Sequence, residues 1–203
     1  MKAVSPADFL AALHPYKCSD HHLTGPITAQ QIEGQGSVYH LEGRILHAMA
    51  AEYGGPILEI GSDLGISTRY LAAGASLHRG SVAPYVYAYD PLHKWEADAD
   101  ADWAGKIKQV HTAFAKSDLV FSMAFIDGDH RYGSILADYT CASKCVRGPL
   151  VFHDTHPDCP FPTNPSNGSE ARQVVKDLLD EAKWDLVDIQ SPAGLIIAYP
   201  LPH

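Results

Sequence analysis

The sequence predicts an α/β protein: a Rossmann-like, doubly wound sheet of seven strands in a three-layer α/β/α arrangement. Three observations lead to this prediction. Short apolar segments typical of buried strands alternate with segments of helical periodicity along the 203 residues. A glycine-containing turn joins the first of these strands, residues 57–60, to a helix, as in nucleotide-binding folds. The last two apolar segments flank residues 191–194 in a hairpin-like manner, which favours a mostly parallel sheet with an antiparallel last strand.

Composition and charge are those of one globular domain, residues 1–203. Hydrophobic residues make up 46% and charged residues 19% of the chain, which is not a disordered composition. The net charge of −9 argues against a nucleic-acid partner. No apolar run is long enough to cross a membrane, and no signal peptide is recognised. The four cysteines form no CxxC pair, so the sequence supports neither a zinc ribbon nor a disulfide scaffold. We therefore expect a cytoplasmic protein with reduced thiols, and a homo-oligomer is compatible with these features.

The N-terminal part is expected to be helical. Ser5 can cap a short helix that has Pro6 at its first position. We expect residues 1–35 to form one or two helices and a loop that act as a lid over an acceptor, and residues 36–203 to form the Rossmann-like core. Within this core, apolar residues recur with helical spacing from residue 38 to 53, where Gly-Gly-Pro follows.

The remaining elements follow from apolar runs and breaker residues. Strands are expected at residues 57–60, 84–90, 107–111, 122–127, 150–154, 184–189 and 195–199. Helices are expected over residues 134–146 and 170–182, with a long proline-containing loop at residues 155–169. Ligands bind outside the carboxyl ends of the strands in such sheets. The polar residues at these ends therefore predict one cleft.

The turn after residues 57–60 is suited to an anionic ligand group. Gly61 and Gly65 allow close backbone approach, and Ser67 begins a helix whose free N–H groups favour a negative charge. Asp63 stands where a dinucleotide fingerprint has its second glycine, and an acid there would repel a pyrophosphate. The turn therefore predicts a nucleotide-like ligand other than a dinucleotide.

Acidic residues end three of the predicted strands. Asp90 is placed to accept hydrogen bonds from two ribose hydroxyls, although a strand-end turn aspartate is the better explanation when Asp90 is taken alone. Asp127 and Asp154 would converge on one cleft, where two carboxylates need a cation or a proton between them. An oxygen-rich site of this kind suits Mg²⁺ or Mn²⁺.

Two histidines flank these acids. His153 could add a nitrogen ligand, but strand alternation would point it away from Asp154 unless the strand has already ended. His130 follows Asp127 by three residues and could take a proton at neutral pH. We therefore expect catalysis or metal binding at His130.

Four segments together carry a family resemblance: ILEIGSDLGIST, YAYDP, AFIDGDHRYGSILADY and LVFHDT. They resemble the class I S-adenosylmethionine-dependent methyltransferases. More narrowly, they are similar to small-molecule O-methyltransferases of the catechol O-methyltransferase type and of the macrocin and cephalosporin type, which carry an IDGDH motif. The resemblance covers roughly residues 36–155.

The resemblance implies S-adenosylmethionine as cofactor and a small hydroxylated acceptor, such as a sugar, a phenol or a natural product. It implies a set of cofactor-binding residues: Ser37, Glu59, Gly61, Ser62, Asp63, Gly65, Ser67, Asp90, Thr112, Ala113, Phe114 and Asp127. Asp127 and Asp154 match metal-binding positions, and His130 stands at the position of a general base. Thr155 replaces the asparagine or acid that often follows the second metal-binding aspartate, so His153 or His130 is the candidate third ligand.

Two other functions fit the same pattern. A nicotinamide-dependent oxidoreductase could share the architecture, although Asp63 and the absence of GxGxxG argue against it. A non-catalytic homologue that only binds the cofactor is the second alternative, against which the intact IDGDH and HD motifs weigh.

Overall fold

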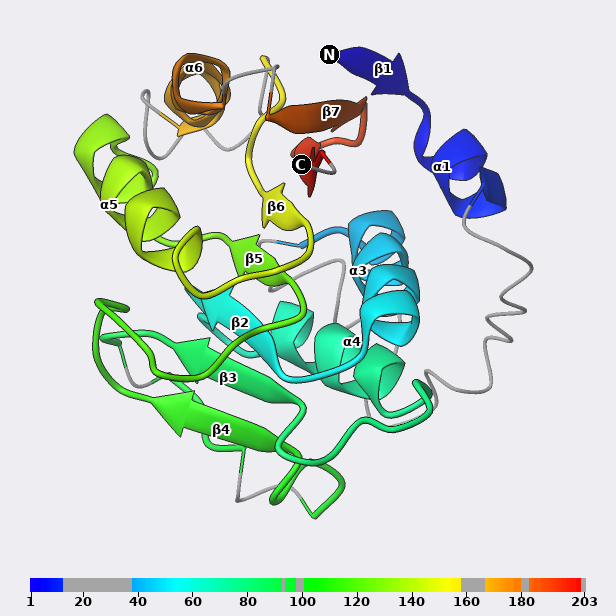
Figure 1. Ribbon diagram of the computed structural model, residues 1–203, viewed down its shortest axis with the longest axis vertical. Coiled ribbons are helices and arrows are strands. Elements are labelled where there is room, and N and C mark those ends of the chain that lie inside the picture. Colours follow the sequence, from blue (N-terminus) through cyan, green and yellow to red (C-terminus); the bar gives the residue numbers. More distant parts are fainter. Residues whose placement is uncertain (13–37, 93, 98–100, 158–166, 180–182, 202–203) are drawn as a thin grey trace.

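The computed structural model describes residues 1–12, 38–92, 94–97, 101–157, 167–179 and 183–201 (Figure 1). One sheet runs through it with the strand order β1-β7-β8-β6-β5-β2-β3-β4. The strands are β1 (Lys2–Val4), β2 (Ile57–Ile60), β3 (Val86–Tyr89), β4 (Ile107–Val110), β5 (Ala124–Ile126), β6 (Leu150–Phe152), β7 (Trp184–Ile189) and β8 (Leu195–Pro200). The helices are α1 (Pro6–Ala12), α3 (His40–Tyr53), α4 (Ile66–Ala75), α5 (Tyr132–Ala142) and α6 (Asn167–Leu178).

The predicted fold class is confirmed, with one strand more than expected. The strand β8 is antiparallel to both of its neighbours, β6 and β7, and every other pair in the sheet is parallel. The prediction of seven strands is wrong because β1 pairs with β7 at the edge of the sheet. A strand of three residues, of which two are exposed, has no hydrophobic pattern by which a sequence could reveal it.

Two apolar cores cover the two faces of the sheet, as strand alternation requires. Along β2, Ile57 packs into the core beneath α3 and α4, whereas Leu58 and Ile60 pack into the core beneath α5 and α6. Figure 1 shows α3 and α4 on one side of the sheet and α5 and α6 on the other. The continuous apolar strands are thus explained by burial on both faces.

Helix boundaries differ from the predictions at both ends, and α5 and α6 each end four residues earlier than expected. The predicted short N-terminal helix is α1, and the Ser5 hydroxyl accepts a hydrogen bond from the backbone N–H of Asp8, as a helix cap does. Helices α5 and α6 begin two and three residues earlier than expected. Residues 13–37 and 158–166, which include most of the predicted lid and loop, lie outside the described residues. No helix in the described ranges is long and apolar enough to cross a membrane.

Strand order places a ligand site beside β2. The chain builds the sheet outward from β2 in both directions, to β3 and β4 on one side and to β5 and β6 on the other. The connections on the two sides therefore diverge above the carboxyl end of β2. Such switch points leave a crevice in doubly wound sheets.

Candidate functional site

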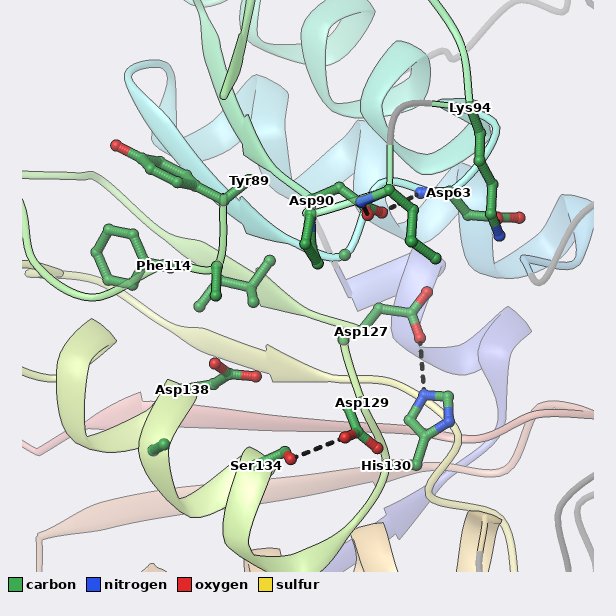
Figure 2. A pocket seen from close by; sticks show the side chains of 17 residues that line it. Asp63, Tyr89, Asp90, Lys94, Phe114, Asp127, Asp129, His130, Ser134 and Asp138 are labelled. Carbon is green, nitrogen blue, oxygen red and sulfur yellow. Dashed lines mark hydrogen bonds and ion pairs between the residues drawn. The ribbon is translucent and has the colours of Figure 1, made fainter. Parts of the chain in front are cut away.

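A cavity of about 660 Å³ lies at this switch point (Figure 2). Its walls come from the segments that follow β2, β3, β4 and β5 and from one side of α5. The lining residues are Ile60, Gly61, Asp63, Tyr89, Asp90, Pro91, Leu92, Lys94, Ala113, Phe114, Asp127, Gly128, Asp129, His130, Ser134, Ala137 and Asp138. A cavity of this size, apolar on one side and acidic on the other, suits a small organic ligand with polar groups.

The turn after β2 is held close to the end of β5. Gly61 has φ +85°, and a Cβ at this position would lie 2.2 Å from the carbonyl oxygen of Asp127. Gly65 has φ +74°, and a Cβ there would overlap the ring of Trp95 at 2.2 Å. Both positions thus require glycine for backbone conformation and for space. The turn can therefore approach a ligand and the IDGDH segment together.

Asp90 braces this turn from the end of β3. Its Oδ2 accepts hydrogen bonds from the backbone N–H groups of Ser62 and Asp63, both at 2.9 Å. Its Oδ1 accepts one from the N–H of Leu92 at 2.7 Å. A carboxylate has about four lone-pair sites, so Asp90 keeps acceptor capacity toward the cavity that it lines.

Glu59 lies under the turn and is fully buried. Burial raises its pKa to about 8, although the hydroxyl of Ser67, which donates a hydrogen bond to Oε1 at 2.6 Å, works in the opposite direction. At neutral pH this carboxyl is therefore mostly protonated in the absence of a cation beside it.

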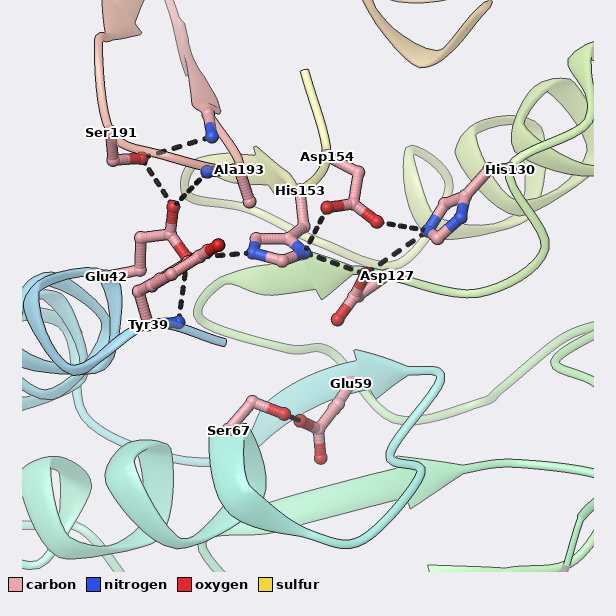
Figure 3. Close-up of polar contacts among 11 residues, drawn as sticks. Tyr39, Glu42, Glu59, Ser67, Asp127, His130, His153, Asp154, Ser191 and Ala193 are labelled. Carbon is pink, nitrogen blue, oxygen red and sulfur yellow. Dashed lines mark hydrogen bonds and ion pairs between the residues drawn. The ribbon is translucent and has the colours of Figure 1, made fainter. Parts of the chain in front are cut away.

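Four side chains converge beyond the ends of β5 and β6, as Figure 3 shows. Nδ1 of His153 lies 3.0 Å from Oδ1 of Asp127 and 3.4 Å from Oδ1 of Asp154. Nε2 of His130 lies 3.2 Å from Oδ2 of Asp154 and 3.4 Å from Oδ1 of Asp127. Asp127, His153 and Asp154 each offer one ligand atom within 4.8 Å of the others. Asp127 and Asp154 thus lie close together, as their positions at the ends of neighbouring strands led us to expect.

A strained backbone explains how His153 and Asp154 face the same site. Strand β6 ends at Phe152, and Asp154 has φ +53°, a left-handed conformation that few non-glycine residues adopt. The alternation of strand side chains therefore no longer applies at these two residues. Strained conformations of this kind are often found at functional sites.

Glu42 also belongs to this cluster, although no sequence motif predicts its position there. It lies in the first turn of α3 and is fully buried. Its Oε2 is 3.0 Å from Nε2 of His153, and its Oε1 accepts hydrogen bonds from the Ser191 hydroxyl at 2.6 Å and the Ala193 N–H at 3.1 Å. Glu42 and His153 are 111 residues apart in the chain, so no local motif connects them.

Opposite charges set the protonation of the cluster. Burial disfavours the charged form of His153, but Asp127 and Glu42 outweigh it and raise its pKa well above the usual value. The pKa of His130 is also raised, since Asp127 and Asp154 outweigh its burial. Burial raises the pKa of Asp154, whereas the two histidines lower the pKa of Asp127 despite its burial. Without a cation, these histidines therefore supply the positive charge that the acids need.

Some predicted cofactor residues line the cavity and others do not. Gly61, Asp63, Asp90, Ala113, Phe114 and Asp127 are in its wall. Glu59, Ser62, Gly65 and Ser67 are buried beneath or beside the turn, and Thr112 is exposed and does not line the cavity. Ser37 lies outside the described residues.

Several lining residues were missed by sequence reasoning. Lys94 forms an ion pair with Asp63 at the rim, and Asp138 enters the cavity from α5. Asp129 lines it too and could have been found, because it belongs to the IDGDH motif. Lys94 lies in a segment without a recognisable motif. Asp138 lies in the AFIDGDHRYGSILADY segment but outside its IDGDH part, and only the folded chain shows that it lines the cavity.

Comparison with known proteins agrees with this geometry. Residues 58–155 match a protein family described as "Methyltransferase domain", a segment that runs from β2 to just beyond Asp154. No curated protein sequence matches the chain.

Solved structures share the fold at low sequence identity. Cofactor-bound Rv0187 from MTB is 21% identical with a TM-score of 0.64, and the match covers 96% of this chain and 88% of that one. The O-methyltransferase TomG from Streptomyces achromogenes, in complex with SAM, is 22% identical with a TM-score of 0.60 and 82% coverage of both chains. An O-methyltransferase from Bacillus cereus, in complex with SAH, is 19% identical with a TM-score of 0.64, covering 97% of this chain and 90% of that one.

These matches and the sheet topology agree with each other. The matched family covers the strands that form the cavity, and the chain shares its fold with the two solved O-methyltransferases. Residues 58–155 therefore match a methyltransferase domain, and the chain shares its fold with solved O-methyltransferases that bind SAM or SAH.

Proposed function

We propose that this protein transfers the methyl group of S-adenosylmethionine to a hydroxyl of a small acceptor, with a divalent cation at Asp127, His153 and Asp154. One observation carries the proposal: the cavity and the acid–histidine cluster share Asp127 and His130. A methyl donor in the cavity would thus lie beside groups that can activate an acceptor. This adjacency is what a methyl-transfer site requires.

The cavity offers partners for each part of the cofactor. Asp90 retains acceptor capacity for ribose hydroxyls, and Phe114 and Tyr89 supply aromatic surface next to it. Buried Glu59, which lies close to the turn, would favour the cationic amino and sulfonium groups of this cofactor. Asp63 takes the place of the second glycine of a dinucleotide fingerprint, which argues against the nicotinamide alternative.

The cluster near Asp127 has a donor set that fits a divalent cation. Nδ1 of His153 lies 3.0 Å from Oδ1 of Asp127 and 3.4 Å from Oδ1 of Asp154. These distances are close to the ~3 Å that separates neighbouring ligand atoms when each metal–ligand bond is about 2.1 Å long. An imidazole nitrogen in the set favours Mn²⁺ over Mg²⁺, because Mg²⁺ prefers oxygen ligands alone.

The chain's own residues would position and deprotonate the acceptor. A cation bound there would neutralise Asp127 and Asp154 and lower the pKa of an acceptor hydroxyl. His130, at the edge of the cavity, is the candidate to accept the hydroxyl proton at a ring nitrogen. The acceptor oxygen would then attack the sulfonium methyl group, with S-adenosylhomocysteine as the leaving group. The acidic charge of the chain favours a small-molecule acceptor over a nucleic acid.

A methyl-transfer assay tests this proposal. The purified protein is incubated with S-adenosylmethionine carrying a labelled methyl group and a panel of sugars and phenols, with Mn²⁺ or with EDTA. We expect transfer to at least one acceptor, inhibition by EDTA, and a loss of about 10²-fold or more in turnover for His130→Ala and Asp127→Asn. Asp118→Asn is the matched control and should retain activity, because this exposed aspartate neither lines the cavity nor belongs to the acid–histidine cluster.

The results separate the parts of the proposal. Undiminished turnover in EDTA would contradict the requirement for a metal ion. Undiminished turnover in His130→Ala would contradict the role of His130 as the general base. Failure of the folded protein to bind S-adenosylhomocysteine would contradict the function as a whole.

A further inference from the structure

Glu42 is bonded more extensively than a helix cap requires. Its Oε2 accepts a hydrogen bond from the backbone N–H of Tyr39 at 3.0 Å, which caps α3. That contact alone could be made by an exposed side chain. Glu42 is instead fully buried and also contacts the segment before β8 through Ser191 and Ala193. A buried carboxylate is costly unless its surroundings stabilise it, and such an arrangement calls for a role beyond capping.

The fourth contact of Glu42 is with the candidate metal ligand His153. Glu42 approaches Nε2 of the imidazole, and the two aspartates approach Nδ1 on the other side of the ring. The edge of the ring of Phe125 packs near His153, with ring centroids 5.7 Å apart. The ring of His153 is therefore held in one orientation, with each nitrogen assigned to a different partner (Figure 3).

We infer that Glu42 is a positioning residue for the metal centre: it holds the Nε2–H of His153 so that the Nδ1 lone pair is directed between Asp127 and Asp154. The inference rests on the metal site of the proposed function. Histidine ligands in metal sites commonly donate their other ring N–H to a carboxylate, which fixes both tautomer and orientation. To act as a ligand, His153 must release its Nδ1 proton to solvent while the Nε2 proton stays on the bond to Glu42.

Binding of Mn²⁺ to the metal-free protein tests this inference. The affinity is measured by calorimetry and by the loss of the free Mn²⁺ EPR signal for the wild type, Glu42→Gln and Ser191→Ala. We expect Glu42→Gln to bind Mn²⁺ about 10- to 100-fold more weakly, the usual effect of losing such a partner. Ser191→Ala is the matched control: it removes a bond to the other oxygen of Glu42 and should stay within about threefold of the wild type. S-adenosylhomocysteine is titrated into each variant as a separate check of the cofactor pocket.

A spectroscopic measurement distinguishes positioning from mere structural support. Pulsed EPR of the Mn²⁺-loaded wild type should show coupling to a histidine nitrogen, and this coupling should vanish in His153→Gln but persist in His130→Gln. If Glu42→Gln does not fold, ¹⁵N NMR of the Zn²⁺-loaded wild type replaces it. We then expect His153 as the Nε2–H tautomer with Nδ1 bound to the metal.

Each outcome bears on a different statement. Wild-type Mn²⁺ affinity in folded Glu42→Gln, or an Nδ1–H tautomer of His153, would overturn the role of Glu42 while the proposed function stands. Absence of Mn²⁺ binding to the wild type would overturn this role and the metal centre, even where S-adenosylhomocysteine binds. Failure of S-adenosylhomocysteine alone to bind would overturn the proposed function and leave the role of Glu42 supported by the Mn²⁺ data.

Discussion

At the residue scale, the two buried acids Glu42 and Glu59 differ in their protonation. Glu42 is surrounded by donors and stays charged, with its pKa lowered by His153 and Ser191 despite its burial. Glu59 has fewer donors, and its pKa is raised to about 8 by the same kind of burial. Two carboxyls with similar exposure thus differ in charge because of what surrounds them. Glu59 is the one whose titration affects stability in the neutral range.

Replacement of Glu59 by glutamine should remove a pH dependence of stability. The pKa of Glu59 is higher in the folded state, about 8, than its ordinary value of 4.5, so the folded state binds the proton more tightly. Its contribution to stability is therefore lost as the pH rises from about 4.5 to about 8. We expect Glu59→Gln to be more stable than the wild type at pH 8 by a few kcal/mol and nearly equal at pH 4.5, measured by urea unfolding without ligand.

Exposed Glu52 on α3 supplies the control for this measurement. Glu52→Gln should follow the wild-type curve of stability against pH. A stability difference between wild type and Glu59→Gln that stays constant from pH 4.5 to pH 8 would show that Glu59 is not proton-linked to folding.

At the element scale, the turn between β2 and α4 holds the strand ends that form the site in fixed positions. Its backbone N–H groups bind Asp90 at the end of β3, and Gly61 lies against the end of β5. Three strand ends are therefore fixed relative to one another by one turn. Strand β6 adds the fourth through the left-handed Asp154, which turns its side chain to the same cluster.

Gly61→Ala should destabilise the protein by about 2 kcal/mol or more. The positive φ alone costs an L-residue about 1–2 kcal/mol, and the added Cβ would overlap the backbone of Asp127. Gly133→Ala is the control, because this glycine lies in α5 with open space around it and should gain up to about 1 kcal/mol. Urea unfolding measures both, and equal stability of Gly61→Ala and the wild type would refute the close approach of turn and β5.

The whole molecule shows which features a sequence can reveal. The strands of the parallel core and the C-terminal pair could be predicted because each is a short segment rich in apolar, aromatic or β-branched residues. The proximity of Asp127 and Asp154 could be predicted because each follows a strand whose carboxyl end lies beside the other, whereas the orientation of His153 depends on where β6 ends. These inferences need only local pattern and topology.

The features that could not be predicted depend on packing between distant segments. Glu42 contacts His153, which is 111 residues away in the sequence, and Asp138 lines the cavity from the side of α5 that faces it. The short strand β1 exists because β7 offers it an edge, and not because of its own pattern. In each case the information lies in tertiary contacts, which periodicity along one segment does not contain.

The central claim, a pocket for S-adenosylmethionine at the end of β2, is tested most directly by calorimetric titration with S-adenosylhomocysteine. We expect one binding site per chain, with no comparable heat from NAD. In Asp90→Ala, which loses the acceptor at the end of β3, we expect affinity to fall about tenfold or more, with circular dichroism confirming the fold. No binding of S-adenosylhomocysteine to the folded wild type, or binding of NAD with equal affinity, would contradict the account.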